Sequence, residues 1–268
     1  MKEICKQGYE VDELVSMLRS MLRIRMAEEQ IGELVKKREI ICPAHLSVGQ
    51  EAIAVGVCSA LTNNDYLFST HRAHGHYLAK GGNLKAMMAE MFGRKTGCSG
   101  GRGGSMHLVQ PDIGIMGTTS IVGGCFPIAV GAGLSLKLRD EKNISVVFFG
   151  DGAMDEGVFF ESLNFAAIHK LPVLFVCENN YYATHMRICR RIRCDRQVNN
   201  LQQYEVCECD QLIKRVEAFN VPAKRVYGND PVEVNKTARF MIDYIRSGQG
   251  PYFLDCLTYR WRGHVGPN

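Results

Sequence analysis

Two short polar motifs, each following an apolar run, constrain the fold of this chain most. The run from Ile144 to Phe149 leads into Gly150-Asp151-Gly152, and the run from Val173 to Cys177 leads to Asn179-Asn180. Between them, Gly157 to His169 carries apolar side chains at helical spacing. Short apolar runs predict buried strands, and a strand–helix–strand unit with a right-handed crossover makes its strands parallel. The sequence therefore predicts an α/β fold, a parallel sheet flanked by helices.

Asp151 and Asn180 are predicted to lie at the carboxyl edge of that sheet, where open α/β folds bind ligands. They offer a carboxylate oxygen and a side-chain carbonyl oxygen, and Mg²⁺ takes about six oxygens, usually including phosphate and water oxygens. Glycines beside Asp151 let a diphosphate approach the backbone, and the N-terminus of the next helix favours an anion. The alternative is that both residues only cap turns. Because both motifs occur on one βαβ unit, we expect a magnesium–diphosphate site.

The composition is that of an ordinary globular chain. Its 268 residues are 46% hydrophobic and 22% charged, and the formal net charge is +4, which is too small to indicate nucleic-acid binding. We find no apolar run of about 18 residues or more, so no membrane span is expected, and the N-terminus lacks the features of a signal or transit peptide. The eleven cysteines, an odd number and mostly within apolar runs, indicate reduced thiols and a cytoplasmic location.

Apolar spacing and turn residues predict the other elements. Ser47 is expected to cap the helix that begins near Gln50. We see no internal repeat and no linker, so residues 1–268 are expected to form one domain with an N-terminal helical extension. The predicted elements are helices over 12–38, 50–60, 83–92 and 127–139, a strand over 66–69, a strand-end loop over 71–76 and a glycine-rich loop over 93–104.

The motifs resemble those of a known enzyme family. The GDG…NN pattern resembles the thiamine diphosphate signature. Its surroundings resemble the alpha subunit of the decarboxylating, first component of pyruvate, acetoin or branched-chain 2-oxoacid dehydrogenase complexes, from about residue 12 to 264. The motifs that carry the resemblance are His71-Arg72-Ala73-His74-Gly75, Gly103-Gly104-Ser105-Met106-His107, Gly150-Asp151-Gly152-Ala153 and Thr258-Tyr259-Arg260. The resembling subunits continue beyond the position of Asn268, so the C-terminal part of the family is expected to be absent here.

The resemblance implies the thiamine diphosphate-binding fold and an oxidoreductase that cleaves a small 2-oxo compound or acetoin and passes the acyl group to a lipoyl carrier. It also implies thiamine diphosphate and Mg²⁺ as cofactors. The implied partners are a beta subunit that supplies the pyrimidine-binding domain of a two-alpha, two-beta tetramer, and a lipoyl-bearing acyltransferase. Nucleic-acid and membrane partners are not expected. Two alternatives stay open: a two-chain thiamine diphosphate lyase or transketolase-like enzyme with another acceptor, and a non-catalytic interaction protein.

The resemblance also implies roles for individual residues. His264 would bind the diphosphate and assist acyl transfer, and His45 would lie near the 2-oxoacid, although a structural role is an equal alternative for His45. Ser120 replaces a usual glycine and His71 a usual tyrosine. The implied cofactor-binding residues are His71, Arg72, Ser120, Val122, Asp151, Gly152, Ala153, Asn180 and His264; the implied metal ligands are Asp151, Asn180 and the backbone carbonyl of Tyr182; the implied catalytic residues are His264 and His45.

One segment departs from the family pattern. Residues 187–196 (RICRRIRCDR) contain five arginines, where relatives have a mixed, partly acidic segment. A solvated or interface loop is the simplest interpretation, and binding of an acidic partner face or a phosphorylated substrate is the alternative. Cys189, Cys194, Cys207 and Cys209 lie nearby, but their spacing is not that of a standard zinc site.

Overall fold

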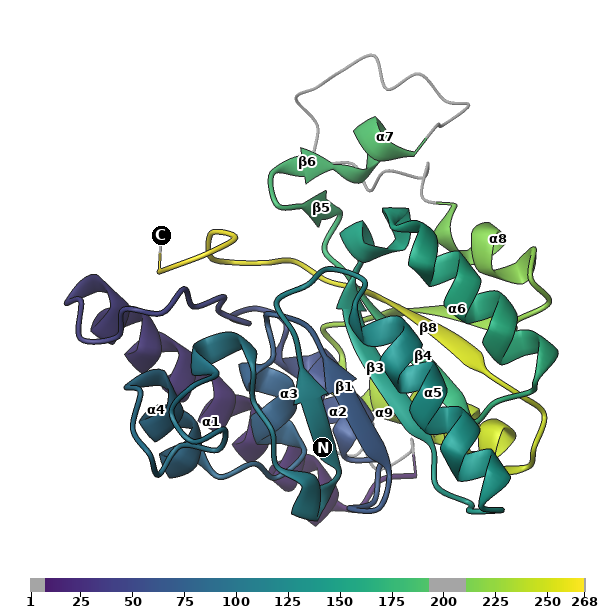
Figure 1. Ribbon diagram of the computed structural model, residues 1–268, viewed down its shortest axis with the longest axis horizontal. Coiled ribbons are helices and arrows are strands. Elements are labelled where there is room, and N and C mark those ends of the chain that lie inside the picture. The colour runs from purple at the N-terminus through teal and green to yellow at the C-terminus, as the bar shows by residue number, and fades with distance from the viewer. Residues whose placement is uncertain (1–7, 193–210, 268) are drawn as a thin grey trace.

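A six-stranded, wholly parallel sheet forms the centre of the molecule (Figure 1). The computed structural model describes residues 8–192 and 211–267. The strand order is β2-β1-β3-β4-β8-β7, and each neighbouring pair is parallel. The predicted parallel α/β fold is therefore confirmed, and all six carboxyl ends lie along one edge. The strands are β1 (Tyr66–Ser69), β2 (Ile115–Thr118), β3 (Ser145–Gly150), β4 (Val173–Asn179), β7 (Ala223–Tyr227) and β8 (Tyr252–Leu257).

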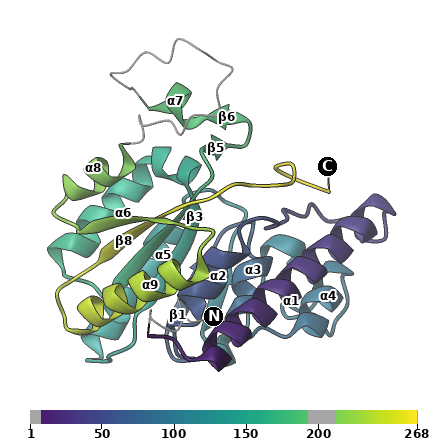
Figure 2. The same cartoon turned by 180° about the vertical axis from the view of Figure 1, so that it is seen from behind.

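Helices cover both faces of the sheet (Figures 1 and 2). Along β3, Val146 and Phe148 join one buried apolar cluster, and Val147 and Phe149 join the other. Side chains alternate across a strand, so burial of both faces explains why the strand sequences are apolar throughout. One cluster includes residues of α1 (Val11–Lys36), α2 (Glu51–Cys58), α3 (His74–Ala79), α4 (Leu84–Met91) and α9 (Pro231–Arg246), and the other includes residues of α5 (Cys125–Leu138), α6 (Gly157–Ile168) and α8 (Leu212–Glu217).

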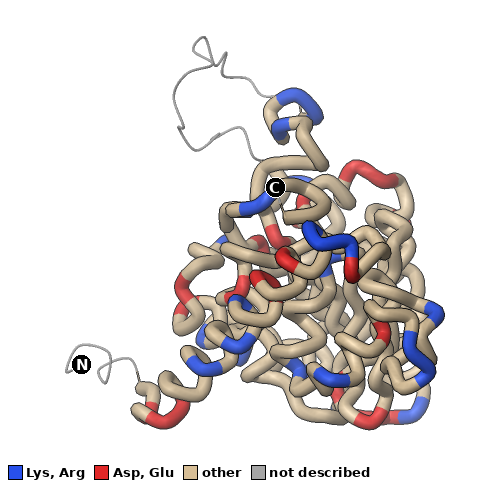
Figure 3. Tube along the Cα trace, turned by 90° about the vertical axis from the view of Figure 1, so that its left-hand side faces the viewer, with Lys and Arg blue, Asp and Glu red and all other residues tan. Residues whose placement is uncertain are grey.

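Smaller elements project above the carboxyl edge of the sheet (Figure 1). An antiparallel hairpin of β5 (Tyr182–Ala183) and β6 (Met186–Arg187) leads into the short helix α7 (Ile188–Arg191). Basic and acidic residues are interspersed along the chain (Figure 3). In the described part of the chain, no helix is long and apolar enough to cross a lipid bilayer.

Two local predictions are wrong. Ser47 does not cap α2, because the helix begins at Glu51 without a side-chain cap and the Ser47 hydroxyl instead donates to Glu28 at 2.6 Å. The predicted loop over 71–76 contains the start of α3 at His74. Both errors have one cause: polar residues that resemble caps and loops in the sequence are buried against partners from distant segments.

A buried polar network explains why α3 begins at His74. His74 Nδ1 donates to Glu28 Oε2 at 2.9 Å, and its Nε2 shares a hydrogen bond with the Ser105 hydroxyl at 2.7 Å. Burial opposes ionisation of Glu28, but His74 and Ser47 favour it more strongly, and the pKa of Glu28 lies below its usual value. This carboxylate–imidazole–hydroxyl order is also that of a hydrolase triad, but Ser105 is only 1% exposed. The network therefore holds α3 in place rather than meeting a substrate.

The glycine-rich loop over 93–104 is held by one buried carboxylate. Glu90 in α4 accepts backbone N–H groups from Ser99 and Gly101, each at 2.8 Å, and from Gly103 and Gly104 at 2.6 and 3.2 Å. Burial raises the pKa of Glu90, but the four donors outweigh it, and the pKa lies below its usual value. The loop thus takes its shape from a side chain outside it.

Replacing Glu90 by glutamine is expected to lower the free energy of unfolding by about 2–4 kcal/mol, because hydrogen bonds to a charged group are the stronger kind and the new amide N–H faces other donors. Urea denaturation measures the change. Glu217→Gln, at an exposed position of α8, is the matched control. Equal stability of the two variants would contradict this role for Glu90.

Candidate active site

The predicted site residues follow the carboxyl ends of five neighbouring strands. Because all the strands are parallel, these residues lie along the same edge of the sheet. His45 approaches this edge from the segment before α2. Ser120 and Val122 follow β2, His71 and Arg72 follow β1, Asp151, Gly152 and Ala153 follow β3, Asn180 and Tyr182 follow β4, and His264 follows β8.

Asp151 and Asn180 extend from adjacent strands. The register pairs Gly150 of β3 with Glu178 of β4, so each residue lies one or two positions beyond the last pair. Asp151 is fully buried and Asn180 is 7% exposed. The Asn180 side-chain oxygen accepts from the Tyr182 N–H at 3.2 Å, and a carbonyl oxygen can accept at a second position. Both residues thus offer oxygens suited to a hard cation.

Asp151 also pairs with Arg191 of α7. A divalent cation at Asp151 would therefore share the carboxylate with Arg191 or displace Arg191 from it.

Gly152 lies against the hairpin strand β5, because a Cβ there would lie 2.7 Å from the Ala183 Cβ. The glycine thus permits the approach of β5, which was not expected from the sequence.

Gln50 is a site residue that sequence reasoning missed. Its Oε1 accepts from Asn180 Nδ2 at 2.9 Å, which turns the asparagine oxygen away from the glutamine. Gln50 is 1% exposed, and its Nε2 has no hydrogen-bond partner among the described residues. A buried donor without an acceptor costs about 1–3 kcal/mol, so this N–H suits a ligand oxygen. The only signal in the sequence was the position of Gln50 at the start of an expected helix.

Three histidines from distant segments form a cluster at this edge. The ring centroids of His45 and His71 are 4.5 Å apart, those of His45 and His264 5.0 Å, and those of His71 and His264 5.4 Å. Burial lowers the pKa of His45 to about 4, that of His71 to about 3 and that of His264 to about 4. Nearby Arg72 adds to each shift. The three rings are therefore neutral at pH 7.

Arg72 joins the segments that carry these histidines. Its guanidinium donates to the backbone carbonyls of Leu46 and His264. Burial, then repulsion from Arg260, lowers the pKa of Arg72 to about 10, so Arg72 stays charged at neutral pH. The predicted diphosphate-binding arginine thus also fixes the backbone around His45 and His264.

Arg260 determines which ring nitrogen of His264 carries the proton. Its Nη1 lies 3.2 Å from His264 Nδ1. A guanidinium only donates, so Nδ1 accepts and the neutral ring carries its proton on Nε2. Arg260 also donates to the Thr184 carbonyl at 3.0 Å, and Asp151 is its largest favourable electrostatic neighbour. His264 can therefore donate a hydrogen bond to an anion.

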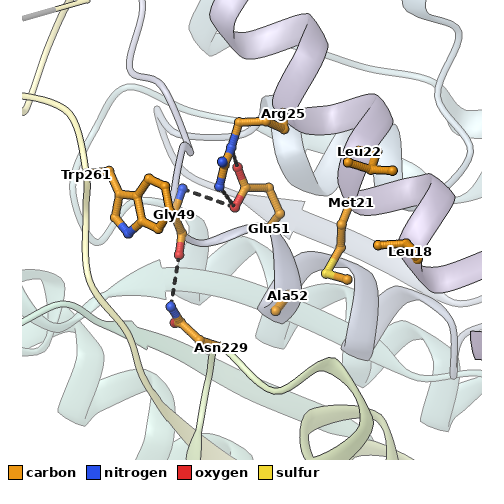
Figure 4. A pocket seen from close by; sticks show the side chains of 9 residues that line it. All are labelled: Leu18, Met21, Leu22, Arg25, Gly49, Glu51, Ala52, Asn229 and Trp261. Carbon is orange, nitrogen blue, oxygen red and sulfur yellow. Dashed lines mark hydrogen bonds and ion pairs between the residues drawn. The ribbon is translucent and has the colours of Figure 1, made fainter. Parts of the chain in front are cut away.

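A hollow of about 220 Å³ is lined by residues of α1 and α2 and by Gly49, Asn229 and Trp261 (Figure 4). In it, Arg25 pairs with Glu51 at 2.6 Å and lies 4.6 Å from the Trp261 ring centroid. Gly49 has φ of +97°, and a Cβ there would lie 2.5 Å from Trp261. The hollow contains none of the predicted site residues. The contacts of Trp261 with Arg25 and Gly49 hold the segment before α2 against the segment that carries His264.

Ser120 and Val122 are more exposed than the other predicted site residues. Both lie in an exposed loop after β2, and Val122 is 45% exposed. Among the contacts of the described residues, none joins them to the histidine cluster. Their predicted contact with the cofactor remains a prediction.

The edge as a whole fits a metal-bound diphosphate. Asp151 and Asn180 supply oxygens for a cation. Arg72, Arg260, the His264 Nε2–H and the Gln50 amide supply positive charge and donors for phosphate oxygens. Neutral imidazoles add donors without the cost of a buried charge.

Comparison with known proteins agrees with this chemistry. The profile of the dehydrogenase E1 component family matches residues 19–266. The chain is 41% identical over 267 residues to the alpha subunit of acetoin:2,6-dichlorophenolindophenol oxidoreductase from Bacillus subtilis, which covers 98% of this chain and 75% of that protein. It is 39% identical over 254 residues to the alpha subunit of the pyruvate dehydrogenase E1 component from Zymomonas mobilis, which covers 94% of this chain and 68% of that protein. The chain belongs to the dehydrogenase E1 component family, whose members depend on thiamine diphosphate.

Proposed function

We propose that this chain is the alpha subunit of a thiamine diphosphate-dependent dehydrogenase acting on acetoin, pyruvate or a similar 2-oxo compound. The observation that carries the proposal is the meeting, at one sheet edge, of the Asp151–Asn180 oxygens with the cluster of Arg72, Arg260 and His264. Cation ligands beside anion donors suit the magnesium-bound diphosphate end of the cofactor. The names of the relatives favour this function over a lyase or a non-catalytic protein.

In this proposal Asp151, Asn180 and the Tyr182 carbonyl hold Mg²⁺. Arg72, His71, Gly152, Ala153 and His264 contact the diphosphate, while the backbone around Ser120 contacts the aminopyrimidine and Val122 lies under the thiazolium ring. When bound, thiamine diphosphate supplies a nucleophilic carbon that attacks the substrate carbonyl and accepts the electron pair left by C–C cleavage. His45, next to His71 and His264, faces the 2-oxo substrate. The His264 Nε2–H donates a hydrogen bond to a diphosphate oxygen, and His264 assists the passage of the acyl group to the lipoyl carrier.

The partners follow from the architecture. The described residues contain one large sheet, and all the proposed ligands except Ser120 and Val122 belong to the diphosphate and metal half of the cofactor site. We infer that a beta subunit supplies the pyrimidine half in a two-alpha, two-beta tetramer, and that a lipoyl-bearing acyltransferase accepts the acyl group. The described cysteines are free thiols, which is compatible with a cytoplasmic location.

The test is reconstitution. The chain is co-purified with its proposed beta subunit, and reduction of 2,6-dichlorophenolindophenol is measured with acetoin, pyruvate and branched 2-oxoacids. We expect reduction that requires both chains, thiamine diphosphate and Mg²⁺, and the preferred compound identifies the substrate. A folded pair that neither binds thiamine diphosphate by calorimetry nor reduces the dye with any of these compounds would refute the proposal.

A further inference from the structure

The arginine-rich segment places one cation on the buried aspartate of the candidate metal site. Arg191, the last residue of α7, pairs with Asp151 through Nη2 and with Asp155 through Nη1. The Arg191 side chain is only 7% exposed. For this residue the expected solvated loop is wrong, because its charge is engaged inside the chain. Residues 193–196 and the cysteines at 194, 207 and 209 lie outside the described residues.

Backbone contacts explain why Arg191, rather than its neighbour, reaches Asp151. The Ile188 N–H donates to the Tyr181 carbonyl at 2.8 Å, and the Ile192 N–H donates to the Ile188 carbonyl at 2.9 Å. Ile188 and Ile192 are buried, whereas Arg190 is exposed. This single helical turn therefore directs Arg191 toward the sheet edge and Arg190 toward solvent. The basic residues of α7 lie beside the grey trace at the top of Figure 3.

The two carboxylates hold Arg191 by different means. Asp151 is fully buried at the end of β3, where an ionised carboxylate needs a close cation. Asp155 is partly exposed and also lies 3.6 Å from Arg215 Nη1. A guanidinium fork that bridges two carboxylates has a defined geometry. Asp155 thus acts as the outer anchor that keeps Arg191 on Asp151.

A divalent cation at Asp151 would meet this guanidinium at the same carboxylate. Two cations within one buried site repel each other strongly, because the interior screens charge less than water does. Arg260, for which Asp151 is the largest favourable electrostatic neighbour, adds further positive charge. The cation must therefore compete with Arg191 for the charge of Asp151.

We propose that Arg191 is an internal counter-cation of Asp151 and sets the affinity of this site for a divalent cation by competing with it. The inference deepens the proposed function, since it rests on Asp151 being a metal ligand. Tight cation binding then requires Arg191 to leave Asp151. The metal charge and the conformation of α7 are thereby coupled.

The test measures Mn²⁺ affinity of the full chain by titration calorimetry, together with the shift in melting temperature that Mn²⁺ causes. Arg191→Gln is expected to bind Mn²⁺ about tenfold more tightly than the unmodified chain, or better. Asp155→Asn is expected to change affinity in the same direction. Removal of an acidic group ordinarily weakens cation binding, so a gain in this variant reports the loosening of Arg191. Arg191→Lys should stay close to the unmodified chain, and the exposed Arg190→Gln is the matched control.

The proposal would be overturned if the unmodified chain, Arg191→Gln and Asp155→Asn had the same Mn²⁺ affinity and the same melting shift. This includes the case in which Mn²⁺ shifts none of the three melting temperatures. Weaker Mn²⁺ binding in both variants would also overturn it. If Arg191→Gln does not fold, Asp155→Asn decides the matter. The outcome is separate from the proposed function: an active pair with equal Mn²⁺ affinities refutes only the competition, and an inactive pair with the expected affinities refutes only the activity.

Discussion

Replacing Asp151 by asparagine is expected to weaken strongly the magnesium-dependent binding of thiamine diphosphate by the pair of alpha and beta subunits. The asparagine keeps the shape of the side chain but loses the negative charge that neutralises the cation at a fully buried position. We expect the apparent cofactor affinity to fall by about 10²- to 10³-fold, in line with the loss of a close, poorly screened charge pair. Calorimetry with thiamine diphosphate and Mg²⁺ measures it.

The same substitution removes a partner of Arg191, so folding must be measured separately. A thermal melt of each purified variant distinguishes lost binding from lost structure. Asp112→Asn, at an exposed position, is the matched control and should bind the cofactor as the unmodified pair does. An Asp151→Asn pair that is folded and binds the cofactor within about twofold of normal would show that this carboxylate does not hold the metal.

Lowering the pH from 7 toward 4 is expected to destabilise the chain through its histidine cluster. In the unfolded chain these histidines gain protons near pH 6.5, whereas in the folded chain the pKa of His71 is about 3 and the pKa values of His45 and His264 are about 4. The unfolded state therefore binds more protons below about pH 6.5, and stability falls as the pH falls through this range. Each histidine lowers the free energy of unfolding by at most about 1.4 kcal/mol per pH unit. The effect is smaller where water screens the ring, as at His71 and His264.

Urea denaturation at several pH values between 7 and 5 measures this slope. His71→Tyr should make the slope shallower, because it removes one of the histidines that gain a proton at higher pH in the unfolded chain than in the folded chain. Ile41→Gln, at an exposed position, removes no titrating group and should leave the slope unchanged. A slope that is the same in the unmodified chain and in His71→Tyr would show that His71 is not held neutral by the fold.

The sheet was predictable because its strands are buried on both faces. Continuous apolar runs mark such strands, and the rule that ligands bind beyond their carboxyl ends located Asp151 and Asn180 without coordinates. The helix from Gly157 to Ile168 was predicted to within one residue because its apolar side chains recur at helical spacing. These features depend on local sequence and on topology.

The contacts that shape the site depend on distant pairings that no local pattern reveals. Gln50 meets Asn180 across 130 positions, so its role was invisible in a sequence where it seemed only to start a helix. Arg191 reaches Asp151 because one turn of α7 directs it inward, and a sequence with two adjacent arginines does not show which of them turns. Ser47 was misassigned because its hydroxyl donates a hydrogen bond to Glu28 instead of accepting from the N–H groups at the start of α2.

Arg72 also has a consequence for the order of events during synthesis. It binds carbonyls 26 positions before it and 192 positions after it. β1, β2, β3 and β4 can leave the ribosome and pair well before the segment with His264 emerges. A nascent chain can therefore pair four strands early, but it can hold a phosphate-bearing ligand only after the segment that carries His264 has been translated.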